Sequence, residues 1–396
     1  MTTSERMDVE PAVLRWARQT AGFDLPLAAR RLQVKPEVIA RWEEGLASPT
    51  IVQLRKAAAV YKRPLAVLLL PAPIRDPAPP TDFRVTEQRG EDTWTPALHA
   101  EFRRALSQRA VALEILDVWP ESLFPSEYPI RIDLNTDPDT AAHAIRAALD
   151  ADGWRPEVLS RPGELLSTTI EAVERLGVLV IQTERVESSE MQGFSISERP
   201  YPLIALNGKD YHRRRLFTLL HELCHISLNV GGVCDPLDNL NHRESADEIE
   251  IYCNQVAAAI LMPRQRMLDN PLVRSANTDH RWNLEELGQL SQQFGASSQA
   301  VLLRLINLGR ATWQLYDLRR FELEREYERH RQQEEDRRKK SKGGPNYYSL
   351  KVRNLGHGYV SAVLRAYRNQ AISSRDVAAY LGVRFDQLEQ MERRVS

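Results

Sequence analysis

The pentapeptide His221-Glu222-Leu223-Cys224-His225 constrains the fold of this chain more than any other segment. Histidines four residues apart share one face of an α-helix, so both imidazoles can bind the same metal ion. The glutamate between them can then act on a metal-bound water. Leucine and isoleucine recur at helical spacing from about 211 to 230, which predicts a largely buried helix that Gly231-Gly232 ends.

Two short strands are predicted before this helix. Pro202 to Leu206 is an apolar run that ends in the turn signal Asn207-Gly208. Gln192 to Ser197 alternates in the manner of a strand and is expected at a sheet edge. An extended peptide substrate could add to that edge as a further strand, and an ordinary edge strand without a ligand explains the pattern equally well.

A third metal ligand is expected on the next helix, because catalytic zinc takes three protein ligands and a water. That helix is predicted from about 244 to 262. Glu250 fits best, since the small residues Ala257 to Ala259 allow close approach of a neighbouring helix. Asn254, one turn later, could accept a hydrogen bond from a ligating histidine. Glu248 points about 160° away on an ideal helix and ranks second. Taken alone, the segment also suits an amphipathic helix with solvated carboxylates.

These segments resemble the ImmA/IrrE metallopeptidases. The resemblance rests on the lead Arg214-Arg215-Leu216-Phe217-Thr218-Leu219-Leu220 before the pentapeptide and on the helix from Glu250 to Asn254 that continues to Leu261-Met262-Pro263. It implies one Zn²⁺ per chain, bound by His221, His225 and Glu250, with Glu222 as general base. It also implies a peptidase core from about 152 to 317, with a small sheet against helices as in gluzincins.

One position departs from the family pattern. Cys224 stands where these peptidases usually carry glycine. Cysteine is small and tolerated in a core, so Cys224 and Cys253 are interpreted as packing residues rather than ligands.

Residues 10–70 predict a separate helix-turn-helix domain. The sequence Trp42-Glu43-Glu44-Gly45 followed by Ser48-Pro49-Thr50 resembles the XRE/Cro type. This segment contains ten Lys or Arg against five Asp or Glu, which suits a DNA backbone. The candidate base-reading residues on the recognition helix are Lys35, Glu37, Ala40 and Arg41. Pro36 and Glu37 are poor DNA-contacting residues, so a module for dimerisation or repressor docking is the alternative.

The remaining segments carry no recognisable chemistry. A proline-rich linker is expected at 71–93, a helical bridging region at 94–151, a charged helix or linker at 318–345, and a small helical C-terminal region at 346–396. The predicted fold is multi-domain and mainly α: an N-terminal all-α helix-turn-helix, a central α+β gluzincin-like metallopeptidase with a small sheet, and a helical C-terminal region.

Composition predicts a cytoplasmic protein that does not enter a membrane. The sequence has no apolar run of eighteen residues and no apolar leader. Its three scattered cysteines argue against a disulfide framework and for a reducing compartment.

The leading functional hypothesis is a zinc-dependent endopeptidase that cleaves a protein partner. In family terms the partner is an XRE-type repressor, whose cleavage would control stress, phage or mobile-element genes. The alternative is a DNA-binding regulator, or a toxin-antitoxin component, whose zincin-like domain senses rather than cleaves. The retained Glu222 favours the enzyme, because a sensor needs no general base. DNA bound through the N-terminal domain and a second copy of the chain, in a homodimer, are the further partners considered.

Overall fold

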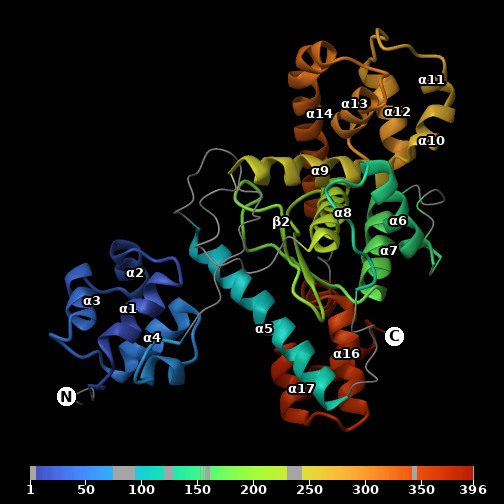
Figure 1. Cartoon of the computed structure of the whole chain (residues 1–396). Coiled ribbons are helices and arrows are strands. Elements are labelled where there is room, and N and C mark those ends of the chain that lie inside the picture. The colour runs from blue at the N-terminus through green and yellow to red at the C-terminus, as the bar shows by residue number, and fades with distance from the viewer. Residues whose placement is uncertain are drawn as a thin grey trace. The chain divides into compact units, whose positions relative to one another are not determined.

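The computed structural model describes most of the chain, and Figure 1 shows its ribbon. The described residues are 6–74, 94–119, 128–151, 153–154, 156, 161–229, 243–340 and 346–395, with only the backbone for 243–247, 335 and 338–340. Residues 75–93, most of the predicted linker, lie outside this set. The described residues form two compact units, which divide between Leu106 and Ser107.

The N-terminal unit consists of short helices around one apolar core. They are α1 (Pro11–Gln19), α2 (Leu25–Leu32), α3 (Pro36–Glu43), α4 (Ile51–Tyr61) and the 3-10 helix η1 (Leu65–Leu69). The part of the longer helix α5 (Pro96–Val118) up to Leu106 also belongs to this unit. Polar side chains fix the helix starts. Asp24 accepts a hydrogen bond from the Leu27 N–H at the start of α2, and Thr50 forms a capping box at the start of α4.

A buried ion pair joins α1 to the predicted recognition helix, α3. Arg18 donates from Nε and Nη2 to the two carboxylate oxygens of Glu43, at 2.7 and 2.9 Å. The hydrogen bond to Glu43 raises the pKa of Arg18, although burial opposes the charge. Trp42 is buried in the same core. The orientation of α3 is therefore fixed by both charge and packing.

The second unit contains a three-stranded sheet. Its strands are β1 (Leu179–Thr183), β2 (Gly193–Ile196) and β3 (Leu203–Asn207), in the order β1-β3-β2. β1 runs parallel to β3, and β2 pairs with β3 in the antiparallel sense. Both strands predicted before the pentapeptide are present, and β2 lies at an edge of this sheet.

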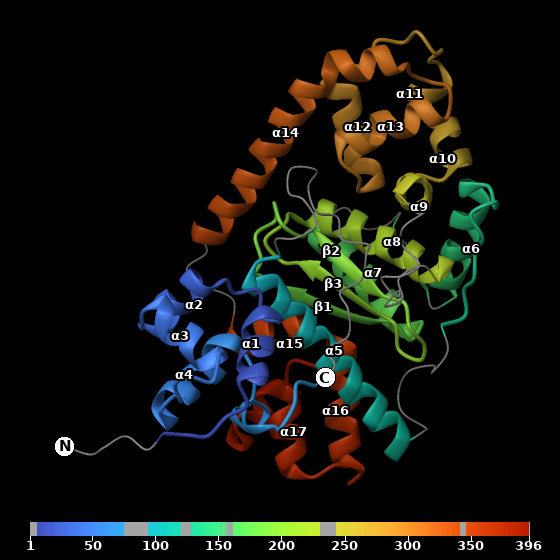
Figure 2. The same ribbon diagram turned by 60° about the vertical axis from the view of Figure 1, so that its left-hand side comes forward.

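The core around the sheet includes four helices that come before Pro263 in the chain. They are α6 (Pro138–Asp150), α7 (Pro162–Arg175), α8 (His212–Leu228) and α9 (Arg243–Leu261). Figure 2 shows α8 between the sheet and α9. α8 ends at Leu228 because Asn229 adopts the left-handed conformation, at φ 56°. Gly231-Gly232, the predicted stop, lies outside the described residues. α6 was expected in a bridging region, yet it packs on α9 within the peptidase core.

The chain after α9 is helical. The elements are α10 (Arg264–Asp269), α11 (Pro271–Arg274), α12 (Leu284–Phe294), α13 (Ser298–Asn307) and α14 (Trp313–Lys340). A capping box formed by Asn283 and Glu286 starts α12. α14 runs without interruption through residues 317 and 318, where a domain boundary was expected. It is held against the start of α8, where Tyr327 packs on Tyr211 and Glu334 contacts His212 at 3.1 Å.

The C-terminal region is a cluster of short helices. They are α15 (Tyr347–Leu355), α16 (His357–Arg368), α17 (Ser374–Leu381), the 3-10 helix η4 (Phe385–Gln387) and α18 (Leu388–Glu392). α15 and α16 pack on β1. The Gly358 N–H donates to the buried carboxyl of Glu174 on α7 at 3.0 Å, and burial raises the pKa of Glu174 to about 8. The predicted fold class is confirmed. Within the described ranges, no helix combines the length and apolar character needed to span a bilayer.

Candidate metal centre

α8 carries the pentapeptide into the interior of the second unit. His221, Glu222 and His225 are each 0% exposed. The Nε2 atoms of the two histidines lie 3.0 Å apart, so both rings direct the same atom toward one point. Two neutral imidazole nitrogens can share only one proton, whereas a metal ion accepts both lone pairs.

Glu250 on α9 reaches the same point. Its carboxylate oxygens lie 3.2 Å from His221 Nε2 and 3.1 Å from His225 Nε2. α9 packs directly on α8, and Ala257 to Ala259 are buried along it. Glu248, the second choice from the sequence, is exposed. The structure therefore brings His221, His225 and Glu250 together, with their ligand atoms all within 4.8 Å of one another.

The three residues fit zinc in number, chemistry and spacing. Tetrahedral zinc with bonds of about 2.0 to 2.1 Å places neighbouring ligand atoms about 3.3 Å apart. The two Nε2 atoms lie 3.0 Å apart, and each lies 3.1 or 3.2 Å from one of the two Glu250 oxygens, which is close to this value. Burial raises the pKa of Glu250, but its contacts with His221 and His225 outweigh burial and hold the pKa well below its usual range. Glu250 is therefore an anionic donor beside two imidazole donors.

Cys253, the residue before Asn254, lies next to the outer part of this cluster. Its thiol lies close enough to His225 and to Cys224 to influence their charges. Burial raises the pKa of Cys253, so the thiol stays protonated. Both cysteines are free and buried, as a packing role requires. Asn254 is half-buried one turn after Glu250, and its hydrogen bond to a ligating histidine stays a prediction.

Ser195 on β2 holds the proposed general base. Its Oγ donates a hydrogen bond to Glu222 Oε2 at 2.8 Å, and both residues are buried. A Cβ at Gly193 would lie 2.5 Å from Thr218 Cγ2, so only glycine lets β2 approach α8 this closely. Sequence reasoning did not identify Ser195. The period of two along a strand, which puts 193 and 195 on one face, was the available signal.

β2 also offers backbone groups beside the cluster. The Asn207 N–H donates to the Gln192 carbonyl at 2.9 Å, which makes these two residues a hydrogen-bonded pair of the antiparallel ladder. Such pairs alternate, so Gly193 and Ser195 direct their N–H and C=O groups away from β3. An extended peptide could pair with these groups next to Glu222.

The predicted DNA-reading residues lie on one helix of the N-terminal unit. Lys35 is the N-cap residue of α3 and is exposed, as are Glu37 and Arg41. Ala40 is half-buried. Their contacts with DNA stay a prediction.

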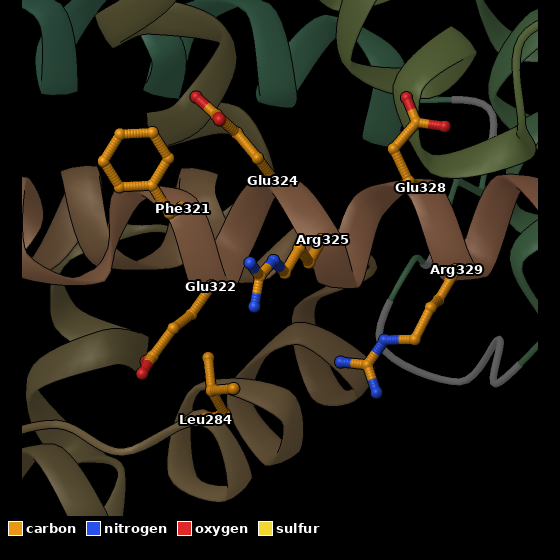
Figure 3. A pocket seen from close by; sticks show the side chains of 7 residues that line it. All are labelled: Leu284, Phe321, Glu322, Glu324, Arg325, Glu328 and Arg329. Atoms are coloured by element: carbon orange, nitrogen blue, oxygen red, sulfur yellow. The ribbon is translucent and has the colours of Figure 1, made fainter.

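A hollow of about 730 Å³ lies along α14, where it faces the start of α12. Figure 3 shows its lining side chains, which are Leu284, Phe321, Glu322, Glu324, Arg325, Glu328 and Arg329. None of them belongs to the histidine cluster. The hollow is therefore not the metal centre.

A helix with His-Glu-x-x-His, a carboxylate from the following helix and an adjacent edge strand together resemble the site of a metallopeptidase. The comparisons with protein families agree. Residues 173–305 match the Peptidase M78 family model, described as the IrrE N-terminal-like domain. Residues 14–68 match the family model described as Helix-turn-helix. The predicted fusion of an ImmA/IrrE-like peptidase domain to an N-terminal XRE-type domain is confirmed. A search of curated proteins gave no match.

Proposed function

We propose that this protein is a zinc-dependent endopeptidase, with His221, His225 and Glu250 as the ligands of one Zn²⁺. The observation that carries the proposal is the position of Glu222, which is buried beside the three ligands and hydrogen-bonded by Ser195. A sensor that only binds metal has no use for such a carboxylate.

The chain's own groups supply proton transfer and orientation. Bound zinc would act as a Lewis acid toward water and a peptide carbonyl. Glu222 would accept a proton from the attacking water and deliver it to the leaving amine. Ser195 keeps Glu222 Oε2 in a fixed position through its 2.8 Å hydrogen bond. The edge of β2 that faces away from β3 would hold the substrate in an extended conformation.

The proposed substrate is a protein, namely an XRE-type repressor, as the resemblance to ImmA/IrrE peptidases implies. Cleavage would then relieve repression of stress, phage or mobile-element genes. The match of residues 14–68 to a helix-turn-helix supports DNA as a second partner. Lys35 and Arg41 are the exposed basic residues proposed to contact it.

The test compares three variants with the wild type. Each protein is loaded with zinc, its metal content is measured, and it is incubated with purified XRE-type repressors encoded near its gene. We expect Glu222→Gln to keep the metal but lose cleavage, and Glu250→Gln to lose both. Glu248→Gln, which changes an exposed carboxylate on the same helix, is the matched control and should keep both.

Three outcomes would contradict the proposal. Metal-free wild-type protein with all three ligands intact would remove the zinc site. Cleavage that persists in Glu222→Gln would remove Glu222 as the base. Zinc binding without cleavage of any repressor by the wild type would instead favour the sensing alternative.

A further inference from the structure

The C-terminal helices repeat the geometry of the N-terminal helix-turn-helix. Gln19, Leu25 and Leu32 mark the end of α1 and the two ends of α2. Arg368, Ser374 and Leu381 mark the same points of α16 and α17, at one constant offset in residue number. The third helices, α3 and η4 with α18, begin and end at the same offset. The loop between the first and second helices therefore has the same length in the N-terminal and the C-terminal helices, and so does the loop between the second and third helices.

The turn between the second and third helices is also the same. Gln33 and Gly382 occupy its left-handed position at φ 59° and 58°. The next residue closes the turn by the same backbone hydrogen bond in each case: Val34 N–H to Ala29 O at 3.1 Å, and Val383 N–H to Ala378 O at 3.0 Å. This is the tight turn that sets the angle between the two helices of a helix-turn-helix.

Side chains at positions related by this offset have the same structural roles. Asp24 caps α2 and Ser373 caps α17. The buried pair Ile39 and Trp42 in α3 has its counterpart in Leu388 and Met391 of α18, and both are buried. The glutamates at the ends of the third helices, Glu43 and Glu392, are also equivalent, and each pairs with an arginine of the first helix. The arginines differ by one position: Arg18 is buried with Glu43, whereas Arg368, the equivalent of Gln19, forms a more exposed pair with Glu392 at 3.1 Å.

The charge of this region suits a polyanion. Residues 346–396 contain eight Lys or Arg against four Asp or Glu, whereas the whole chain has a formal net charge of −1. Arg375 in the first turn of α17, Arg384 before η4 and Arg394 after α18 are exposed. Asp386 is within 3.7 Å of Arg384, but this pair is more than two-thirds exposed and can exchange for a phosphate at little cost.

We propose that residues 357–395 are a second helix-turn-helix and that they bind duplex DNA. The third helix, η4 with α18, would lie in the major groove, and Arg375 and Arg394 would contact phosphates on its two sides. The exposed side chains of this face are mostly Arg, Asp, Glu and Ser, with Phe385 as the exposed aromatic, which suits DNA better than an apolar protein interface.

The C-terminal helix-turn-helix, residues 357–395, packs directly on the peptidase domain. α16 packs on β1 and α7, and its Gly358 N–H is bound by the buried Glu174. Gly356, at φ 91°, lets the start of α16 approach the backbone of Val180 on β1. DNA bound here would therefore hold the peptidase domain itself.

The experiment measures full-length protein binding to a fluorescent duplex of about 30 base pairs, a length that covers three helical turns. All proteins carry Lys35→Ala and Arg41→Ala, so that the N-terminal domain contributes less. On this background Arg375→Ala with Arg394→Ala is compared with Arg274→Ala and Arg281→Ala, two exposed arginines of the same unit. Circular dichroism checks that each variant is folded.

We expect the Arg375 and Arg394 replacements to weaken binding at least tenfold and to reduce the salt slope of log K by about 2, because two phosphate contacts are lost. The control pair should change neither quantity. Lysine at both positions should retain most of the binding, since it keeps the charge. Equal effects from the two arginine pairs would overturn the proposal. So would unchanged DNA binding accompanied by a change in sedimentation mass, which would identify a protein-docking surface instead.

Discussion

Replacing Glu174 with glutamine should remove a pH-dependent loss of stability from the second unit. The Glu174 carboxyl is 4% exposed and lies between α7 and the start of α16. Burial raises its pKa from 4.5 to about 8, although the hydrogen bond from the Gly358 N–H opposes the shift. The folded protein therefore keeps a proton that the unfolded chain releases.

The sign of the effect follows from this difference. The contribution of Glu174 to stability is fully present below pH 4.5 and is lost as the pH rises to about 8. Each pH unit inside this window costs about 1.4 kcal/mol of unfolding free energy. Across the window the loss is on the order of a few kcal/mol, a large share of the total stability of an ordinary domain.

Urea unfolding followed by circular dichroism at pH 5 and pH 8.5 measures this loss. Glutamine keeps an oxygen for the Gly358 N–H but cannot ionise. The stability difference between Glu174→Gln and the wild type should therefore grow by a few kcal/mol in favour of the variant as the pH rises. Glu171→Gln is the control, because Glu171 is exposed on the same helix. If both variants show the same small change with pH, the buried carboxyl is not the cause.

Three further replacements test individual contacts. Ser195→Ala should lower the rate of cleavage about tenfold or more while zinc stays bound, since Glu222 loses its 2.8 Å hydrogen bond; an unchanged rate would show that Ser195 does not position the base. Gly193→Ala should lower the melting temperature of the peptidase unit, because the new methyl group meets Thr218 Cγ2 at 2.5 Å; a variant as stable as the wild type would contradict this packing. Glu43→Ala should destabilise the N-terminal unit by about 3 to 5 kcal/mol, because it leaves the charged Arg18 in a core without its carboxylate partner. A loss of unfolding free energy below about 1 kcal/mol, measured by thermal unfolding, would mean that Arg18 becomes exposed to solvent.

Short-range patterns in the sequence were sufficient to predict the helices that carry the candidate metal site. The spacing of His221 and His225 places them on one helix face, and Pro263 limits the next helix, because helical geometry depends on neighbours three or four residues apart. The same reasoning preferred Glu250 to Glu248, and the structure brings Glu250 to the histidines. The α3 start at Pro36 and the capping box at Asn283 were predictable for the same local reason.

The sequence holds no such local signal for contacts between residues that lie far apart in the chain. Ser195 lies 27 positions before Glu222, and no local rule pairs a strand hydroxyl with a helix carboxylate. Glu174 and Gly358 are separated by 184 positions. α14 has charged residues along most of its length, yet it packs on α8 through Tyr327. From sequence alone this segment read equally well as a solvated helix or linker.

The sequence by itself predicted the kind of chemistry, because candidate metal ligands and a candidate general base on a helix are recognised by their spacing. It also determined the N-terminal helix-turn-helix, whose turn and capping residues are local. Only the tertiary structure decided which side chains support that chemistry and what the C-terminal helices form. The hydroxyl of Ser195 and the carboxyl of Glu174 meet their partners through packing between distant elements. Packing energy depends on the whole core and is not encoded at any single spacing.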